Sequence, residues 1–119
     1  RLVLGWSTRG AQQLNLAEST DAVHFTSALG SGLPQTSATA PQVLQRTATD
    51  ACVAWTGTDA VRHLNVQCTT QFPQFPNPAQ TKTVLPETAL GAPGFSGSEI
   101  AWTGTDAAHH LNVAQLQGT

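Results

Sequence analysis

One stretch of 13 residues occurs twice in this chain and constrains its fold more than any other feature. Residues 54–66 read AWTGTDAVRHLNV, and residues 101–113 read AWTGTDAAHHLNV. A shorter and degraded copy, GWSTRGAQQLNL, spans residues 5–16. The three tryptophans of the protein occupy the same place in the three copies, with 49 residues from Trp6 to Trp55 and 47 from Trp55 to Trp102. A period of this length indicates a repeat architecture.

Each copy predicts a β-hairpin, because β-branched and aromatic residues flank a turn that contains Gly and Asp. No segment shows convincing helical periodicity, so the expected fold class is all-β. We expect strands at residues 2–6, 14–17, 23–26, 41–45, 51–55, 64–68, 82–85, 98–102 and 111–113, with a weak strand or turn at 92–95. These strands form three long hairpins separated by two shorter strand pairs.

Two connecting segments are rich in turn-forming residues. Residues 30–34 predict a turn from their glycines and proline. Residues 71–80 contain three prolines and predict an extended surface loop in a polyproline-like conformation. The alternative for this second segment is a partner-binding arm led by Phe72 and Phe75.

The two cysteines flank the central copy. If its hairpin is centred near Ala60, residues whose numbers sum to 120 face each other, and Cys52 and Cys68 satisfy this sum. The register therefore predicts a cross-strand disulfide. Two free thiols in a reducing compartment are the alternative, whereas a bridge indicates an oxidising environment and a secreted or extracellular protein. The spacing of the two cysteines is not that of a zinc site.

Composition excludes several classes of partner. Charged residues make up 10% of the chain, far below the usual ~25%, so Thr, Ser, Gln and Asn must supply the polar surface, as is common in secreted β proteins. The five basic residues are scattered, which argues against nucleic acid. No apolar run approaches the ~18 residues of a membrane span. We expect no cofactor and no metal ion.

A unit of four short strands in about 47 residues has the size of a propeller blade. The expected organisation is a single repeat domain over residues 1–119, with a partial blade at 1–32, a blade at 33–84 and a partial blade at 85–119. Such a chain holds about two and a half blades, and repeats bury their apolar faces only against neighbours. We therefore expect completion by a homo-oligomer, with a dimer favoured, or by a partner chain.

The repeated pattern, Ile/Val-Ala-Trp-Thr-Gly-Thr-Asp followed by Leu-Asn-Val, resembles the central hairpin of β-propeller repeats in sialidase-like proteins and in lectins of the tectonin and Photorhabdus types. The resemblance covers nearly the whole chain and implies a propeller scaffold. It departs from the sialidase Asp-box, Ser-x-Asp-x-Gly-x-Thr-Trp, because here the Trp precedes the Gly and the Asp. A sialidase site also needs a tyrosine nucleophile, and the chain has no tyrosine. We therefore expect glycan binding without catalysis.

The hairpin register gathers candidate sugar-binding side chains on one face. Trp55 lies opposite Asn65, and side chains alternate along a strand, so Trp55, Asn65 and His63 share a face. An aromatic ring with a few placed polar groups is typical of a sugar site. The predicted sugar-binding residues of the three copies are Trp6, Asn15, Trp55, Asp59, His63, Asn65, Trp102, Asp106, His110 and Asn112.

Each of these residue types also has a structural interpretation. The tryptophans can fill the core between sheets, the aspartates can brace turns through their own backbone, and the histidines can be polar residues at strand starts. No pair of carboxylates outside the repeat suggests a glycoside hydrolase. The favoured function is a lectin whose weak, repeated sites gain from multivalency. The alternative is a non-catalytic structural or protein-interaction subunit.

Overall fold

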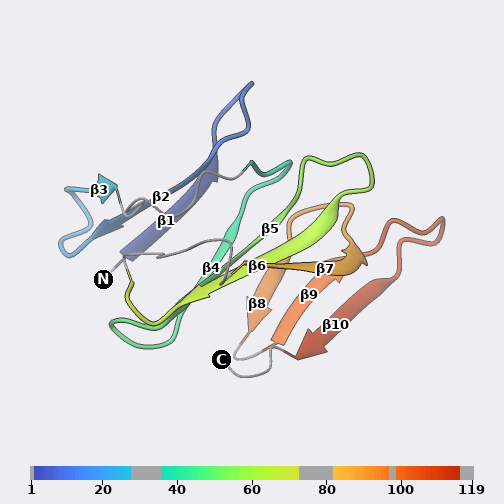
Figure 1. Cartoon of the computed structure of the whole chain (residues 1–119). Coiled ribbons are helices and arrows are strands. Elements are labelled where there is room, and N and C mark those ends of the chain that lie inside the picture. Colours follow the sequence, from blue (N-terminus) through green and yellow to red (C-terminus); the bar gives the residue numbers. More distant parts are fainter. Residues whose placement is uncertain (1, 28–35, 73–81, 97–98, 116–119) are drawn as a thin grey trace.

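A computed structural model describes residues 2–27, 36–72, 82–96 and 99–115 (Figure 1). This part of the chain contains strands and turns and no helix, so the predicted all-β class is confirmed. The strands form three antiparallel sheets in the orders β1-β2-β3, β4-β5-β6-β7 and β8-β9-β10. Their bounds are Leu2–Ser7 (β1), Leu14–Ser19 (β2), Thr26–Ser27 (β3), Gln42–Gln45 (β4), Ala51–Thr56 (β5), His63–Thr69 (β6), Lys82–Thr88 (β7), Gly94–Ser96 (β8), Glu99–Thr103 (β9) and Leu111–Gln115 (β10).

The predicted register of the repeated hairpins is confirmed. In the central hairpin Trp55 pairs with Asn65, and Cys52 pairs with Cys68. The two cysteines form the expected disulfide, with their Cα atoms 4.0 Å apart. The corresponding pairs in the outer hairpins are Trp6 with Asn15 and Trp102 with Asn112. The three copies are therefore the same supersecondary unit.

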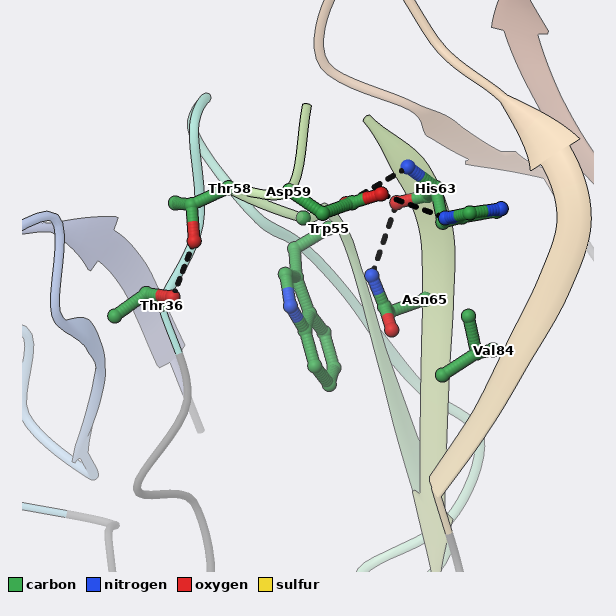
Figure 2. A pocket seen from close by; sticks show the side chains of 8 residues that line it. Thr36, Trp55, Thr58, Asp59, His63, Asn65 and Val84 are labelled. Atoms are coloured by element: carbon green, nitrogen blue, oxygen red, sulfur yellow. Dashed lines mark hydrogen bonds and ion pairs between the residues drawn. The ribbon is translucent and has the colours of Figure 1, made fainter. Parts of the chain in front are cut away.

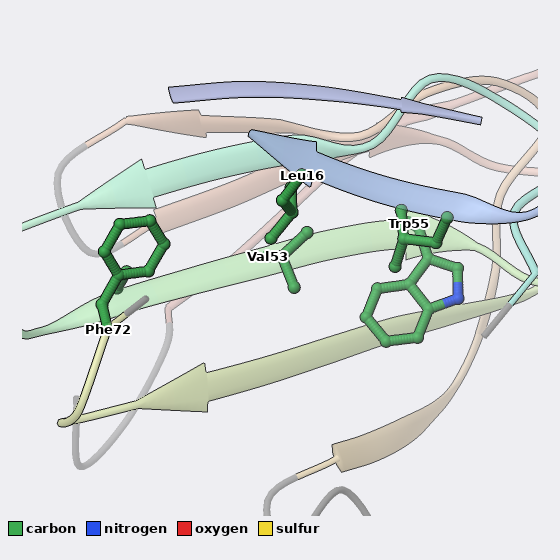
Figure 3. Packing of buried hydrophobic residues seen from close by; sticks show 6 residues of the cluster. Leu16, Val53, Trp55 and Phe72 are labelled. Carbon is green, nitrogen blue, oxygen red and sulfur yellow. The ribbon is translucent and has the colours of Figure 1, made fainter. Parts of the chain in front are cut away.

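The central sheet lies between the other two, and its two inner strands, β5 and β6, are largely buried. Every residue of β5 is buried, which is unusual for a strand whose neighbours are antiparallel and explains its continuous apolar run. One face packs on the first sheet, where Val53 and Trp55 meet Leu14, Leu16 and Phe72 (Figure 3).

The opposite face of the central sheet packs on the third sheet. Leu64 and Val66 of β6 belong to the same cluster as Ile100 and Trp102 of β9. Leu64 and Ile100 are fully buried, as are Leu14, Leu16 and Val53 at the first interface. The molecule therefore has two apolar layers, one on each side of the central sheet.

The three sheets are not arranged as a propeller, which corrects the expected arrangement. Propellers place about four to eight four-stranded blades around a central channel. The described residues instead form one four-stranded sheet with a three-stranded sheet on each face, and β4 contacts both β1 and β8. Because the central hairpin carries apolar residues on both faces, Val53 and Trp55 on one and Leu64 and Val66 on the other, the sheets stack as layers (Figure 1).

The short strands extend neighbouring sheets instead of pairing with one another. β3 pairs with β2, and β4 pairs with β5. β7 pairs with β6 and continues to Thr88, past the boundary expected at residue 84, because Thr88 pairs with His63 at the start of β6. β8 pairs with β9. The result is a four-stranded meander flanked by two three-stranded sheets.

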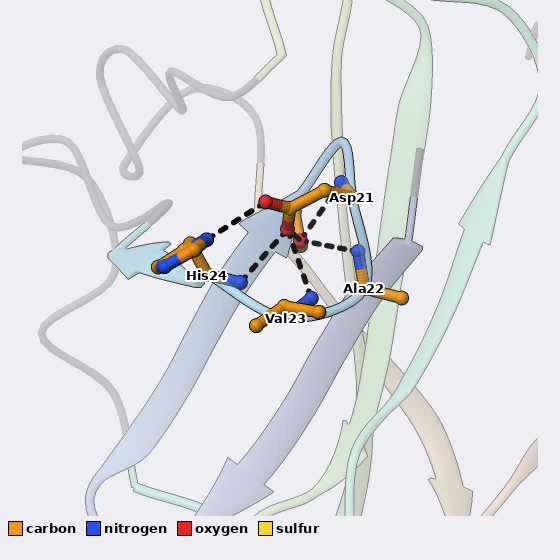
Figure 4. Close-up of polar contacts among 5 residues, drawn as sticks. Asp21, Ala22, Val23 and His24 are labelled. Carbon is orange, nitrogen blue, oxygen red and sulfur yellow. Dashed lines mark hydrogen bonds and ion pairs between the residues drawn. The ribbon is translucent and has the colours of Figure 1, made fainter.

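The strand expected at 23–26 is shorter and lies further along the chain. The Asp21 carboxylate accepts hydrogen bonds from the backbone N–H groups of Val23 and His24, each at 2.8 Å (Figure 4). Ala22 has a φ of 65°. This Asx turn uses the donors that a strand would need, so β3 begins only at Thr26.

The two connecting segments lie largely outside the described residues. The turn expected at 30–34 falls wholly outside them, and so does Phe75. Phe72 is described and is buried in the first core layer, where its N–H donates to the carbonyl of Thr49 at 2.8 Å. Phe72 therefore anchors the end of β6 and does not lead an exposed arm.

Candidate functional site

The turn of the central hairpin is held by a compact set of hydrogen bonds. The N–H of Gly57 donates to the carbonyl of His63 at 2.8 Å, and the N–H of Arg62 donates to the carbonyl of Asp59 at 3.1 Å. Arg62 has a φ of 59°, in the left-handed region. The Asn65 side-chain amide donates to the same His63 carbonyl at 2.9 Å. The amide of Asn65 is therefore a brace of the turn.

Glycine is required where the turn closes on its own side chains. A Cβ at Gly57 would lie 2.7 Å from Asp59 Oδ1 and 2.9 Å from Asn65 Nδ2. At Gly104, the equivalent position of the third hairpin, a Cβ would lie 2.9 Å from Asp106 Oδ1. The glycine of the Trp-Thr-Gly-Thr-Asp motif thus leaves the space that the side chain of the aspartate two residues later occupies.

The third hairpin repeats this geometry. The N–H of Gly104 donates to the carbonyl of His110 at 2.8 Å, and the Asn112 amide donates to that carbonyl at 2.9 Å. His109, which corresponds to Arg62, has a φ of 52°. The motif therefore fixes one local structure in both places.

Each complete turn carries an aspartate–histidine pair. Asp59 Oδ2 lies 2.6 Å from His63 Nδ1, and Asp59 Oδ1 accepts from the His63 N–H at 3.1 Å. Desolvation raises the pKa of the Asp59 carboxyl. The hydrogen bonds from His63 and its charge together lower this pKa by more than desolvation raises it, so the pKa lies below the usual value.

The second pair, Asp106 with His110, has the same arrangement. Asp106 Oδ2 lies 2.5 Å from His110 Nδ1, and Asp106 Oδ1 accepts from the His110 N–H at 3.1 Å. The side-chain hydrogen bond from His110 lowers the pKa of Asp106, against a smaller opposing effect of desolvation. Both carboxylates are thus held as anions that accept two bonds from one histidine.

The first hairpin keeps the turn but loses the pair. The Thr8 hydroxyl accepts from the Gln13 N–H at 2.8 Å, in place of the aspartate carboxylate. The Asn15 amide donates to the Gln13 carbonyl at 2.8 Å, as Asn65 does to His63. Gln12 has a φ of 56°. The first hairpin therefore repeats the backbone conformation of the other two turns but lacks their aspartate–histidine pair.

The central and third hairpins each border a hollow, and the two linings share residue types. The hollow at the central hairpin has a volume of about 320 Å³ (Figure 2). Its lining is Thr36, Trp55, Gly57, Thr58, Asp59, His63, Asn65 and Val84. The hollow at the third hairpin has a volume of about 260 Å³. Its lining is Pro86, Glu87, Thr88, Trp102, Gly104, Thr105, Asp106 and Asn112. Trp, Gly, Thr, Asp and Asn thus recur at the same repeat positions.

Threonines that the sequence prediction did not include close one wall of each hollow. Thr36 Oγ1 lies 2.7 Å from Thr58 Oγ1, and Thr88 Oγ1 lies 2.6 Å from Thr105 Oγ1. Thr36 and Thr88 end the repeated Leu-Pro-x-Thr segments at 33–36 and 85–88. That repetition was the available signal, since a segment that recurs with the motif is expected to contact it.

The predicted tryptophans differ widely in exposure. Trp55 is 1% exposed and Trp102 is 7% exposed, and both pack in the layers between sheets while each is part of the lining of a hollow. Trp6 is 43% exposed on the outer face of the first sheet. The structure thus brings the Trp, Asp and Asn of each complete copy to one hollow, and leaves Trp6 and Asn15 away from both.

No group of three or more His, Cys, Asp or Glu side chains in residues 2–27, 36–72, 82–96 and 99–115 is placed to hold a metal ion. The same ranges contain no helix long and apolar enough to cross a membrane. No protein-family model, curated protein or solved structure matches the chain. The resemblance to propeller lectins therefore stays a prediction.

Proposed function

We propose that this protein is a non-catalytic lectin that binds glycans at the two hollows of the complete hairpins. The observation that carries the proposal is that one lining, with a tryptophan, a carboxylate, hydroxyls and an amide, is built twice at equivalent positions. Sugar hydroxyls are recognised by such polar groups, and an apolar side chain in the floor of a hollow suits the C–H groups of a sugar ring.

The exposed polar groups provide the sugar contacts in this proposal. Asp59, which is 42% exposed, and His63, which is 37% exposed, face solvent in the first hollow. Trp55 and Asn65 are buried, so they shape the floor and brace the turn. Shallow sites of this kind bind weakly one at a time, and two sites on one chain gain by multivalent display. The disulfide fits an extracellular location, where surface glycans are available.

Glycan arrays test the proposal, with a variant that removes one hydroxyl from each hollow. Thr58→Val combined with Thr105→Val keeps the size of both side chains and deletes hydroxyls that line the two sites. We expect the parent to bind a subset of glycans and the double variant to lose at least about tenfold in affinity, the effect of a lost pairing of ~1.4 kcal/mol.

Thr20→Val is the matched control, because Thr20 is exposed and follows β2 at the end opposite the hairpin turn. It should bind as the parent does. A parent that binds no glycan, or a folded double variant that binds as well as the parent, would contradict the lectin proposal.

A second candidate function is a structural or protein-interaction subunit. Large apolar side chains on the outer faces of the first and third sheets are exposed, including Leu4, Trp6, Leu111 and Val113. Isolated exposed apolar residues are ordinary, but contiguous ones mark interaction sites. This observation favours an assembly, whether or not the hollows bind glycans.

A further inference from the structure

The two interfaces inside the molecule are built from the same pair of surfaces. At the first, Leu14 and Leu16 of one hairpin pack with Val53 and Trp55 of the next. At the second, Leu64 and Val66 pack with Ile100 and Trp102. Each hairpin therefore has two faces. Its leucine face carries the Leu-x-Leu or Leu-x-Val of its second strand, and its tryptophan face carries the Trp of its first strand and the residue two positions before that Trp.

The first sheet has an unused tryptophan face. Leu4 and Trp6 hold the positions that Val53 and Trp55 hold in the central hairpin. Leu4 is 50% exposed and Trp6 is 43% exposed, whereas Val53 is 0% and Trp55 is 1% exposed. The difference arises because no sheet of the described chain covers the outer side of β1.

The third sheet has an unused leucine face. Leu111 and Val113 hold the positions of Leu64 and Val66. Leu111 is 75% exposed and Val113 is 59% exposed, whereas Leu64 is 0% and Val66 is 6% exposed. The described chain therefore leaves uncovered one surface of each kind, and the two are the complementary halves of an interface that it already makes twice.

The two uncovered faces are also poor in charge. Residues directly opposite each other in an antiparallel pair place their side chains on the same face. The tryptophan face of the first sheet consists of Leu2, Leu4, Trp6, Asn15, Ala17 and Ser19. Its β1 residues are exposed, whereas Ala17 and Ser19 of β2 are already buried within one molecule. The leucine face of the third sheet consists of Glu99, Ala101, Thr103, Leu111, Val113 and Gln115. Glu99 is the only charged residue of these twelve, so no like charges oppose each other when the faces meet.

We propose that a second copy of this chain docks head to tail on the first, with the tryptophan face of one molecule on the leucine face of the other. Trp6 and Leu4 then pack on Leu111 and Val113, as Trp55 and Val53 pack on Leu14 and Leu16. The contact joins two different surfaces, so each pair of molecules still has one free face of each kind. Association of this type continues beyond two molecules, into closed rings or open arrays.

The test is the mass of the chain in solution, by light scattering and sedimentation, from low micromolar concentration upward. The parent should associate with rising concentration. Leu4→Glu places a charge on the tryptophan face, and Val113→Glu places one on the leucine face. Every contact needs one intact face of each kind, so each variant alone should be monomeric. Both side chains are exposed within one molecule, so the fold should survive, and circular dichroism checks this.

An equimolar mixture of the two variants separates this arrangement from a symmetric one. The Val113→Glu molecule keeps an intact tryptophan face, and the Leu4→Glu molecule keeps an intact leucine face. The mixture should therefore form a complex of one molecule of each and stop there. Val61→Glu is the control: Val61 is exposed at the tip of the central hairpin, outside both faces, and this variant should associate as the parent does.

Three results would overturn the proposal: a parent that stays monomeric at every concentration, a folded single variant that associates as strongly as the parent, or a mixture that forms no complex. None of these results bears on glycan binding. A monomeric variant that still binds glycans would separate the two proposals, since the hollows lie within one molecule.

Discussion

The first and second hairpins are copies of one unit, yet they differ in burial and in how their turns are closed. Trp6 and Trp55 occupy the same register position opposite an asparagine. Trp55 is covered by the preceding hairpin, whereas Trp6 has no preceding hairpin in the described chain. The comparison shows that the hairpin sequence determines the register, whereas the neighbouring sheet determines whether the tryptophan becomes core.

The largest expected difference between the two hairpins is the effect of deleting these tryptophans. Trp55→Ala empties a fully buried site and should lower the free energy of unfolding by about 3–5 kcal/mol. Trp6→Ala should lower it by much less in dilute solution, because nearly half of that side chain is already in water. Urea unfolding at low protein concentration measures both. Equal losses would mean that Trp6 is as well packed as Trp55, and would contradict the difference in burial between the two hairpins.

Much of the fold could be predicted because it depends on local patterns. The repeat, the alternation of residues and the cysteine positions around Ala60 determine hairpin register, and that register holds in all three copies. The arrangement of the sheets could not be predicted in the same way. It depends on the apolar residues that the central hairpin carries on both of its faces, and this pattern fits a stack of layers as well as it fits blades around an axis.

The candidate site was predicted in part for a related reason. The Trp, Asp and Asn positions followed from the motif and its register, and each complete copy brings them to one hollow. Thr36 comes from the segment before β4 and Thr88 from the end of β7, so their contributions depend on how one hairpin meets the segment that precedes it. The burial of Trp55 has the same origin, because it is produced by Leu14 and Leu16 of another hairpin.

A glycine substitution tests how the two turns are closed. Gly57→Ala brings a methyl group to within 2.7 Å of Asp59 Oδ1 and 2.9 Å of Asn65 Nδ2, so the brace must shift. We expect a loss of about 1–3 kcal/mol, the usual range for overpacking. The first hairpin tolerates Thr8 next to its turn because it has no carboxylate there, and the threonine hydroxyl itself makes the bond to Gln13.

Gly91→Ala is the matched control, since a Cβ at Gly91 would meet no heavy atom within 4 Å. Its effect should stay within about 0.5 kcal/mol, as for ordinary surface substitutions. Thermal unfolding of both variants provides the measurement. If Gly57→Ala is as mild as Gly91→Ala, the side chains of Asp59 and Asn65 can shift at little cost. The second turn would then be no more tightly closed than the first.

The smallest expected effect is the response of the complete turns to acid. Asp59 and Asp106 have pKa values below the ordinary 3.8 in the folded protein, because of their hydrogen bonds with His63 and His110. A carboxyl whose pKa is lowered by folding stabilises the protein above its ordinary pKa, and this contribution is lost as the pH falls through the lowered value. In the turn of the first hairpin the hydroxyl of Thr8 accepts the corresponding hydrogen bond, so this turn adds no pH-dependent stability.

The double variant Asp59→Asn with Asp106→Asn keeps the shape of both side chains and removes their charge. Its free energy of unfolding should therefore fall less steeply than that of the parent when the pH is lowered below about 5. Some dependence should remain, because hydrogen bonds from His24, Val23 and Ser19 lower the pKa of Asp21 in another turn. Urea unfolding across an acid series gives the two slopes. A double variant with the slope of the parent would show that the aspartate–histidine pairs add no more to stability than the uncharged turn of the first hairpin does.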